Sequence, residues 1–279
     1  MTGQAHAAGT HDPALLTLID THAHLDAQEF DADRGEVIRR AQQAGVRAIV
    51  CPALSARSSA AVVHLAGQCP GIYAAVGIHP NLCAEAEAAD WEKVSRLAGG
   101  SGVVAIGETG LDRYRDFAPL HLQQEYFERH LELASQLALP VIMHCRQAEA
   151  EVLAILRRAA GQGSLSGVIH AFSGDRGFAE ECLALGLHLS FAGSVTYTNR
   201  KFASLREAAR AVPAQRLLIE TDSPYLVPHP LRGKQNRNEP ARLVHTASAL
   251  AELRGVSPQE LAASTTAAAR RLFRLPGGA

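Results

Sequence analysis

The stretch Leu18-Ile19-Asp20-Thr21-His22-Ala23-His24 decides the fold, because it joins a short apolar run to two histidines one residue apart. Side chains at i and i+2 of an extended segment point to the same side, so both imidazoles can reach one cation. A chain with 13 histidines also places two of them close together by chance. The pair alone therefore does not establish a metal site, and the rest of the sequence must supply further ligands.

Four later apolar runs end in the same way, each at a side chain that can bind a metal. A buried strand is expected to hold only apolar groups, because an ionisable side chain loses its hydration there unless a partner compensates. A divalent cation is such a partner. The runs cover residues 103–108, 141–144, 167–170 and 217–222, and their terminal ligands are Glu108, His144, His170 and Asp222.

Short apolar runs alternate with segments of helical period along the whole chain. The predicted strands lie near residues 16–20, 46–50, 72–76, 103–107, 141–143, 167–170, 187–190 and 216–220. The predicted helices cover residues 34–44, 56–68, 90–97, 119–137, 148–160, 177–185 and 202–211, followed by 240–254 and 258–273. Strands that alternate with helices run parallel, and eight such units at this length predict an α/β fold of the closed (β/α)8 TIM-barrel type. A glycine-rich dinucleotide fingerprint after the first strand is missing, which disfavours an open doubly wound sheet.

Length and composition agree with one barrel domain. The chain has 279 residues, and its hydrophobic content of 47% supplies a sizeable core. We expect residues 15–279 to form a single domain of the metal-dependent hydrolase type. Residues 1–14 are rich in Ala, Gly, Thr and His and lack the pattern of a signal peptide, so we expect a disordered N-terminal tail.

The charge balance and the cysteine content indicate which partners and which cellular compartment suit the protein. Lys and Arg number 27 against 28 Asp and Glu, so contact with a polyanion must depend on local charges. The five cysteines are an odd number without a CxxC spacing, which favours a reducing cytoplasm over a disulfide framework. No run approaches the roughly 18 apolar residues of a membrane span, so we expect no membrane contact.

The candidate ligands are expected to meet at one place. In a parallel barrel the carboxyl ends of the strands and the loops that follow them form a shared mouth. Six ligands are too many for one tetrahedral ion, so we expect two divalent ions bridged by Glu108, whose two oxygens can each bind one of them. Mixed nitrogen and oxygen ligands fit Zn²⁺, Mn²⁺, iron or Mg²⁺. The six residues are His22, His24, Glu108, His144, His170 and Asp222.

At these residues the chain resembles the TatD family of metal-dependent hydrolases, the TatD-type deoxyribonucleases. The resemblance runs from about residue 18 to residue 273, and it is carried by IDTHAHLD at 19–26, VGIHP at 76–80, GETGLD at 107–112, HAFSG at 170–174 and ETDSPYL at 220–226. It implies a (β/α)8 barrel in which His22, His24, Glu108 and Asp222 bind one ion. It also implies that Glu108, His144 and His170 bind the other. The activity it implies is hydrolysis of DNA phosphodiesters, often as a 3′ to 5′ exonuclease.

The chain departs from the usual family pattern in three places, none of them a proposed ligand. Gln147 stands where an acidic residue commonly follows the His-x-Arg of the fifth strand, and Ala268 replaces an Asn. The loop over residues 232–240 is longer than the commonest form. These differences bear on substrate preference.

The expected catalytic residues are Asp222 and Glu108. Coordination lowers the pKa of water to about 7, so the cations would supply hydroxide for attack on phosphorus. Asp222 would orient that nucleophile and accept its proton. The candidate substrate-binding residues, which lie just beyond ligand strands or in the loop after the eighth strand, are Arg146, Arg113, His79, Arg232 and Lys234, with Arg237 beside them.

Two further expectations concern neighbouring residues. Cys145 follows a ligand, but the alternation of the strand turns it away, so we interpret it as a buried apolar thiol. Trp91 and the few tyrosines are interpreted as not interleaved with basic residues, so a nuclease of this sequence would read backbone and ends without stacking on bases.

Two alternatives remain open from the sequence. The same barrel and metals would serve a hydrolase of another small ester, amide or lactone. Relatives of that kind often carry a modified lysine at the end of the fourth strand, where this chain has Glu108. A catalytically idle barrel that binds a partner would be expected to lose ligands, and all six are present. The partner we expect is DNA or another phosphodiester, bound by a monomer.

Overall fold

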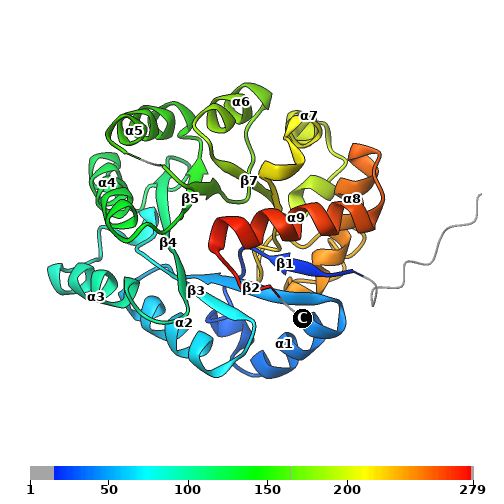
Figure 1. The fold of residues 1–279 in the computed structure, drawn as a ribbon, viewed down its shortest axis with the longest axis horizontal. Helices are drawn as coiled ribbons and strands as arrows, with labels where there is room; N and C mark the ends of the chain where they lie inside the picture. Colours follow the sequence, from blue (N-terminus) through cyan, green and yellow to red (C-terminus); the bar gives the residue numbers. More distant parts are fainter. Residues whose placement is uncertain (1–15, 164, 278–279) are drawn as a thin grey trace, which may run out of the picture.

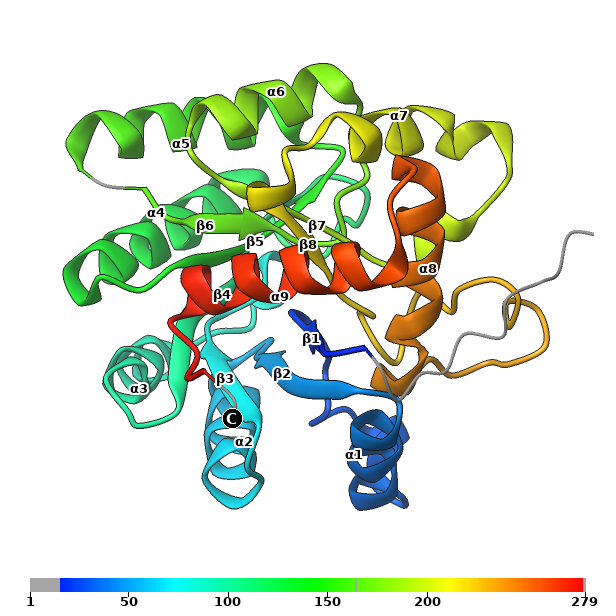
Figure 2. The same cartoon turned by 45° about the vertical axis from the view of Figure 1, so that its right-hand side comes forward.

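The chain forms a nearly closed barrel of eight parallel strands surrounded by helices (Figures 1 and 2). The computed structural model describes residues 16–163 and 165–277, so the N-terminal tail expected over 1–14 lies outside the described residues. The strands are β1 (Leu18–Asp20), β2 (Val46–Pro52), β3 (Ile72–Val76), β4 (Val103–Asp112), β5 (Val141–Arg146), β6 (Gly167–Ile169), β7 (His188–Phe191) and β8 (Leu217–Ile219).

Helices follow the strands in the order that the periodicity predicts. The α-helices are α1 (Arg34–Gln43), α2 (Ala56–Gln68), α3 (Ala88–Ala98), α4 (Leu120–Leu137), α5 (Glu149–Gln162), α6 (Arg176–Ala184), α7 (Ala203–Ala211), α8 (Leu243–Arg254) and α9 (Pro258–Phe273). Short 3-10 helices lie between them: η2 (Gln28–Phe30), η3 (Pro80–Leu82), η4 (Gly193–Thr196), η5 (Arg200–Phe202), η6 (Ala214–Arg216) and η7 (Pro240–Arg242). The predicted (β/α)8 barrel is confirmed.

The strands follow one another around the sheet in chain order, and each pairs in parallel with the next. The ring is completed between β8 and β1 by the segments that follow these strands. Thr21 donates its backbone N–H to the carbonyl of Ile219 at 3.2 Å, and Ala23 forms a parallel bridge with Ser223. The closure therefore lies beside His22, His24 and Asp222.

Alternate strand residues build two separate cores. Leu18 and Ile49 face the surrounding helices, whereas Ile19 and Val50 lie inside the barrel. All four are buried, and the full burial of each aliphatic side chain contributes about 1.5–3 kcal/mol. The strands are apolar on both faces because a parallel barrel buries both.

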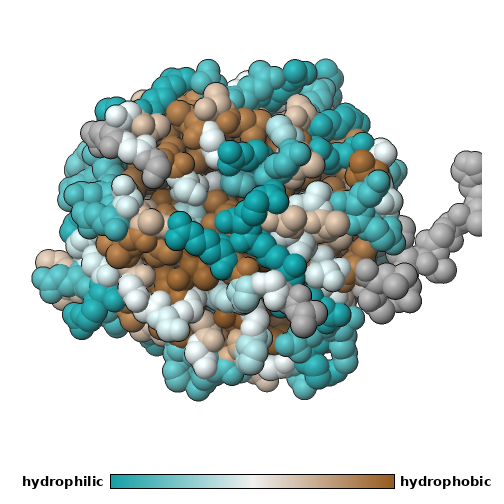
Figure 3. All heavy atoms as spheres, viewed as in Figure 1, coloured by the Kyte–Doolittle hydropathy of each residue, from teal (hydrophilic) through white to brown (hydrophobic). Residues whose placement is uncertain are grey.

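Helix α9 covers the end of the barrel opposite the carboxyl ends of the strands. It packs against β1, β8 and η6, and Ala268 and Phe273 belong to the inner core. Ser257 caps its start, accepting the N–H of Glu260 at 3.1 Å. Figure 3 shows this face, where hydrophilic residues run along α9 and hydrophobic residues lie beside it. Helix α9 therefore covers this end of the barrel interior.

Two boundaries differ from the sequence prediction in ways that matter for the site. Strand β4 continues to Asp112, five residues beyond the predicted end at 107. The segment predicted as one helix from 240 begins as the 3-10 turn η7, and α8 starts at Leu243. In the described part of the chain, no helix combines the length and the apolar character needed to cross a membrane.

A buried histidine joins α4 to the end of β3. The Nε2 atom of His130 accepts the backbone N–H of Ile78 at 3.0 Å, and its Nδ1 contacts the carbonyl of Tyr126 at 2.5 Å. Burial, together with the positive charge of Arg129, lowers the pKa of His130 from its ordinary value of 6.5 to about 4. The neutral ring is the folded form, because a proton on Nε2 would face the N–H of Ile78.

Acidification should therefore weaken the fold through His130. Between about pH 6.5 and pH 4 the unfolded chain binds the proton that the folded chain refuses, so this contribution to the free energy of unfolding falls as the pH falls. His130→Phe should cost about 1–3 kcal/mol near neutral pH, because the N–H of Ile78 loses its acceptor. Near pH 4.5 the free energy of unfolding of wild type is itself lower by roughly 2–3 kcal/mol because of His130. The difference in stability between wild type and His130→Phe should therefore be smaller there.

Urea unfolding at both pH values, with a chelator present, measures this difference. His188, whose pKa is also lowered to about 4, stays in both proteins and cancels. A stability difference that stays constant over the whole pH range would contradict the role assigned to His130.

Candidate metal centre

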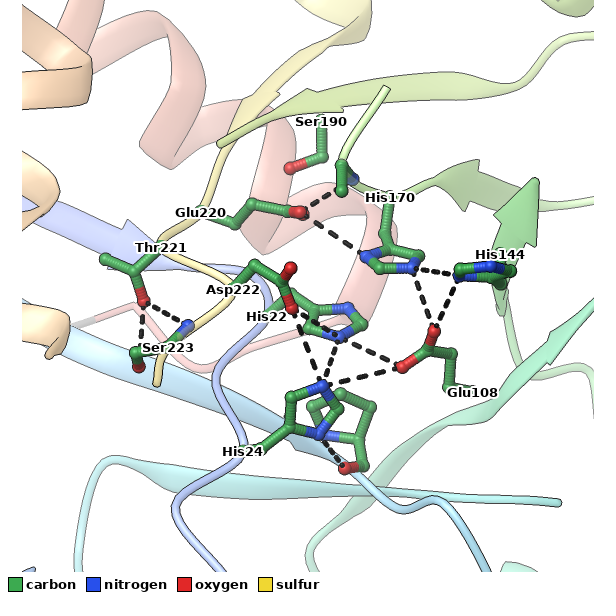
Figure 4. A network of polar contacts seen from close by, with 12 residues as sticks. His22, His24, Glu108, His144, His170, Ser190, Glu220, Thr221, Asp222 and Ser223 are labelled. Carbon is green, nitrogen blue, oxygen red and sulfur yellow. Dashed lines mark hydrogen bonds and ion pairs between the residues drawn. The ribbon is translucent and has the colours of Figure 1, made fainter. Parts of the chain in front are cut away.

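The six side chains predicted to bind metal converge at the open end of the barrel (Figure 4). Glu108 lies in β4 and His144 in β5, and the others follow β1, β6 or β8 by one to four residues. The structure brings together three overlapping groups in which one ligand atom from each residue lies within 4.8 Å of the others. The groups are His22, His24 and Asp222; His22, Glu108 and His170; and His79, Glu108 and His144.

Glu108 stands between the groups and turns one oxygen to each side. Its Oε1 lies 2.9 Å from His170 Nε2 and 3.1 Å from His144 Nδ1. Its Oε2 lies 3.2 Å from His22 Nε2 and 3.6 Å from His24 Nε2. This is the geometry that a carboxylate bridging two ions requires.

The arrangement of the donor atoms fits cations. The Nε2 atoms of His22 and His24 are 3.2 Å apart, as are His144 Nδ1 and His170 Nε2. Two facing ring nitrogens cannot both carry protons at this distance. Glu108 is 2% exposed, and its Oε2 has no hydrogen-bond partner. A buried carboxylate oxygen without a donor and inward-facing imidazole lone pairs are both satisfied by divalent ions.

The electrostatics of the cluster follow from burial and from the mixture of acids and imidazoles. Burial raises the pKa of the Glu108 carboxyl, but His170 and the other imidazoles outweigh it and hold that pKa well below its usual range. Burial opposes the charged form of His24 too, yet the hydrogen bond to Asp222 raises its pKa to about 9. Burial lowers the pKa of His22, helped by the charge of His170. The acids are thus ionised, as metal ligands must be.

Two carboxylates contact the ring nitrogens of His144 and His170 that point away from Glu108. Asp112 Oδ2 lies 3.1 Å from His144 Nε2, which leaves Nδ1 directed at Glu108. Glu220 Oε1 lies 3.4 Å from His170 Nδ1 and accepts the N–H of Ala171 at 2.6 Å. Such partners fix the tautomer and orientation of metal-binding histidines. Neither carboxylate was assigned a role from the sequence, although Asp112, four residues after Glu108 on the same strand, could have been found by its spacing.

A third acid organises the junction of β1 and β8. Asp20 is fully buried and accepts hydrogen bonds from the N–H of His22 at 3.2 Å and from the N–H and hydroxyl of Thr221 at 3.0 and 2.6 Å. Burial raises its pKa to about 7, while the bonds from Thr221 and His22 act in the opposite direction. Asp20 therefore fixes the backbone that carries His22 beside the backbone that carries Asp222.

Asp222 sits on a left-handed backbone turn. Its φ is 52°, its N–H donates to the carbonyl of His22 at 2.9 Å, and its carbonyl accepts the N–H of Tyr225 at 2.8 Å. Aspartate tolerates this conformation better than most residues. The turn brings Asp222 Oδ1 to 3.7 Å from His22 Nε2 and 3.6 Å from His24 Nε2.

The candidate substrate residues lie at different depths. His79 joins the cluster, with Nε2 at 3.2 Å from Glu108 Oε1. Arg146 lies at the rim, where its guanidinium is 3.8 Å from the centroid of the Tyr114 ring. Arg113 is exposed and pairs with Glu151 at 2.6 Å. Arg232, also exposed, lies 3.7 Å from the Tyr197 ring centroid, and Lys234 is exposed in the same loop.

Four other residues singled out from the sequence have different surroundings in the structure. Arg237 pairs with Asp33 at 2.7 and 2.8 Å and so joins the 232–240 loop to the start of α1. Gln147 is exposed at φ 55°, and Ala268 is buried in the inner core far from the mouth. Cys145 is partly buried and packs against the outer core, and burial raises the pKa of its thiol.

The expectation that aromatic and basic residues are not interleaved was wrong for one stretch. The loop after β4 reads Arg113-Tyr114-Arg115-Asp116-Phe117. The guanidinium of Arg115 lies 5.7 and 5.6 Å from the ring centroids of Tyr114 and Phe117. The alternation of basic and aromatic residues in this loop is visible in the sequence itself, 22 residues beyond Trp91.

Comparison with known proteins agrees with this geometry. The family described as TatD related DNase matches residues 19–274. The chain belongs to this family. It is 40% identical over 258 residues to the uncharacterized metal-dependent hydrolase YabD of Bacillus subtilis, covering 92% of this chain and 99% of YabD. It is 39% identical over 263 residues to the 3′-5′ ssDNA/RNA exonuclease TatD of Erwinia billingiae, covering 93% and 100%.

A solved structure gives the same result. The crystal structure of YJJV, a TatD homologue from Escherichia coli, superposes with a TM-score of 0.87 at 31% identity, covering 94% of this chain and 100% of that one. This chain is therefore a metal-dependent hydrolase of the TatD family, and the divalent-metal requirement predicted from its ligands is that of the family.

The carboxylate behind His144 provides a test of the TatD-type metal centre. Asp112→Asn keeps an oxygen for the backbone N–H groups of Tyr114 and Arg115 but places an amide donor against His144 Nε2. Affinity for the ion held by Glu108, His144 and His170 should fall about 10- to 100-fold. Calorimetric titration with Zn²⁺ or Mn²⁺ measures this as a change in one of two binding steps.

Asp175→Asn is the matched control, because Asp175 also accepts a backbone N–H, at the start of α6, and Asn caps helices equally well. Its two binding steps should match wild type. Unchanged affinity in Asp112→Asn would show that this carboxylate does not support the site.

Proposed function

We propose that this protein is a nuclease that hydrolyses phosphodiester bonds of single-stranded DNA or RNA, acting as a 3′ to 5′ exonuclease at a centre of two divalent ions. One ion is held by His22, His24, Glu108 and Asp222, and the other by Glu108, His144 and His170. The observation that carries the proposal is the position of Glu108, with one oxygen toward each group of imidazoles. The nuclease relative named above, the exonuclease TatD of Erwinia billingiae, supports the choice of substrate.

The chain's own residues have distinct tasks in this reaction. When bound, the ions supply Lewis acidity and a hydroxide nucleophile at neutral pH. Glu108 fixes the separation of the two sites, because it is buried and contacts both groups. Asp222 is 13% exposed against 2% for Glu108, so it is the acid that meets solvent at the mouth. Asp222 therefore orients the attacking water and accepts its proton.

His79 acts as a hydrogen-bond donor and not as a ligand. Its Nδ1 accepts the backbone N–H of Asn81 at 3.1 Å, so the proton of the neutral ring is on Nε2. That proton points at Glu108 Oε1, 3.2 Å away. A protonated nitrogen cannot coordinate a cation, but it can donate to a carboxylate or a phosphoryl oxygen. Burial lowers the pKa of His79, which keeps the ring in this neutral form.

The remaining substrate contacts are assigned to the rim. Arg146 follows His144 on β5, and Arg232 and Lys234 lie in the loop after β8, so these side chains border the mouth from two sides. Arg113 is held by Glu151 and is a weaker candidate than Arg146. Guanidinium and ammonium groups there would bind the phosphates that flank the scissile bond.

The proposed enzyme works as a monomer in the cytoplasm. All the residues assigned to the centre come from one chain. The five cysteines, all in the described part of the chain, are free thiols, as a reducing compartment favours.

Loss of the proposed base should abolish turnover while leaving metal in place. Asp222→Asn keeps the size of the side chain and one oxygen, but it cannot accept a proton, so kcat should fall about 100- to 10,000-fold. The measurement is the release of labelled nucleotides from 3′-labelled single- and double-stranded DNA, with and without chelator, beside metal analysis of the protein.

Asp26→Asn removes one negative charge from the same end of the barrel, where Asp26 accepts the hydroxyl of Ser58 at 2.5 Å. This control should keep activity close to wild type. Metal-loaded Asp222→Asn that turns over at the wild-type rate would remove Asp222 from the mechanism. Wild-type protein that cleaves lactones or amides but no phosphodiester would overturn the proposed function.

A further inference from the structure

The loop between β4 and α4 presents two aromatic side chains beside the metal centre. Tyr114 is 54% exposed and Phe117 is 61% exposed. Among the described residues, the large hydrophobic side chains with the most exposure are these two and Tyr225, and all three follow strands that end at the mouth. Leu137 is the last residue of α4 and Val256 follows α8, and both, at 39% each, lie toward the opposite end of the barrel. Exposed aromatic area is therefore concentrated on the side where substrate must enter.

This loop is anchored at both ends by one buried side chain. The amide nitrogen of Gln123, in α4, donates to the carbonyls of Asp112 at 3.1 Å and Ala118 at 2.8 Å. Its amide oxygen accepts the N–H of Asp112 at 2.8 Å. Gln123 is 2% exposed, so these bonds are shielded from water. The two aromatic rings are displayed by a segment whose ends are fixed.

The same loop is joined to the metal centre through one carboxylate. Asp112 Oδ1 accepts the backbone N–H groups of Tyr114 and Arg115, both at 2.9 Å, while its Oδ2 faces His144 Nε2 at 3.1 Å. The backbone N–H of Arg113 donates to the carbonyl of Arg146 at 2.9 Å. The position of the rings is thus set by the acid that orients a metal-binding imidazole.

Two guanidinium groups accompany the rings. Arg146 lies over the Tyr114 ring, with its central carbon 3.8 Å from the centroid, and Arg115 lies within 5.7 Å of both ring centroids. Asp116 is the acid of this loop, so the cations outnumber it once Arg113 is paired with Glu151. Aromatic faces combined with excess guanidinium charge match a ligand that has flat rings on an anionic backbone.

We propose that Tyr114 and Phe117 form a stacking subsite for unpaired nucleobases of the polynucleotide, with Arg115 and Arg146 on its phosphates. This inference rests on the proposed nuclease function and defines its substrate: a strand whose bases near the cleaved end are not paired. Stacking on an aromatic side chain contributes about 1–3 kcal/mol per base and does not depend on base identity. Bases inside a duplex are already stacked, so the subsite selects single strands and frayed ends.

The test compares three phosphodiester substrates that differ in their bases. They are a 3′-labelled single strand, the same strand with abasic nucleotides near its 3′ end, and bis(p-nitrophenyl) phosphate. Tyr114→Ala and Phe117→Ala should each raise KM for the base-bearing strand about 5- to 100-fold. They should leave kinetics on the abasic strand and the small diester unchanged. Wild type should bind the abasic strand as weakly as the variants bind the base-bearing one.

Two further variants test whether the effect comes from stacking or from the loss of any exposed apolar side chain. Tyr114→Phe keeps the ring and should retain the wild-type KM, while Leu137→Ala removes an exposed apolar side chain at the other end of the barrel and should change nothing. An equal loss on base-bearing and abasic strands would show that the loop contacts only the backbone, and an unchanged KM would remove the subsite. Either result overturns the inference.

Failure of the nuclease function gives a different result. In that case wild type cleaves neither strand nor the small diester with Mg²⁺, Mn²⁺ or Zn²⁺. Because no strand is cleaved in that case, fluorescence anisotropy with the labelled strands in the presence of the same ions then decides the subsite independently of turnover. A preference for the base-bearing strand that Tyr114→Ala abolishes supports the subsite, and equal binding of the two strands overturns it.

Discussion

The burial of the Glu108 carboxylate is the constraint on which the open end of the barrel depends. It is 2% exposed. Its oxygens lie within 3.6 Å of ring nitrogens of four candidate ligands, His22, His24, His144 and His170. Desolvating a carboxylate costs several kcal/mol unless it is paired, and imidazoles packed this closely repel one another when protonated. Divalent ions remove both costs, because they neutralise the acid and bind the imidazole lone pairs. The chemistry of the site and the stability of this end of the barrel therefore depend on the same interaction.

The carboxylates behind the imidazoles connect this centre to the barrel itself. Asp112 belongs to β4, Glu220 directly follows β8, and Asp20 ends β1. Asp20 also closes the ring, since it binds the backbone on both sides of the β1 and β8 junction. The positions of the ligands are consequently set by strand pairing and not by flexible loops. A rigid frame of this kind reduces the reorganisation needed when ions and substrate bind.

Most of the fold and the convergence of six candidate ligands could be predicted because both depend on local patterns. Apolar runs mark strands, and a polar residue at the end of a run marks the mouth, so Glu108, His144 and His170 were found without contacts. The contacts of the outer partners depend on register between strands, which the sequence does not contain, although Asp112 itself could have been found by its spacing from Glu108. The pairing of β4 with β5 shifts between Ile106 and Thr109, and this shift aligns Gly110 with His144. Arg237 was expected beside the substrate-binding residues. Its pairing with Asp33 could not be predicted for the same reason, because only the folded chain brings the two side chains together.

Charge balance explains how a chain with a net charge of −1 can receive a polyanion. Five acids face or support the centre, namely Asp20, Glu108, Asp112, Glu220 and Asp222, and two divalent ions would offset most of their negative charge. Without ions, the acids raise the pKa of nearby imidazoles against the effect of burial: Asp112 does so for His144 through the hydrogen bond that it accepts, and Glu108 does so for His170 through its negative charge. With ions, most of this negative charge is offset, so the centre repels phosphate less. The excess positive charge then lies at the rim, on Arg115 and Arg146, so attraction of the strand is local and follows metal binding.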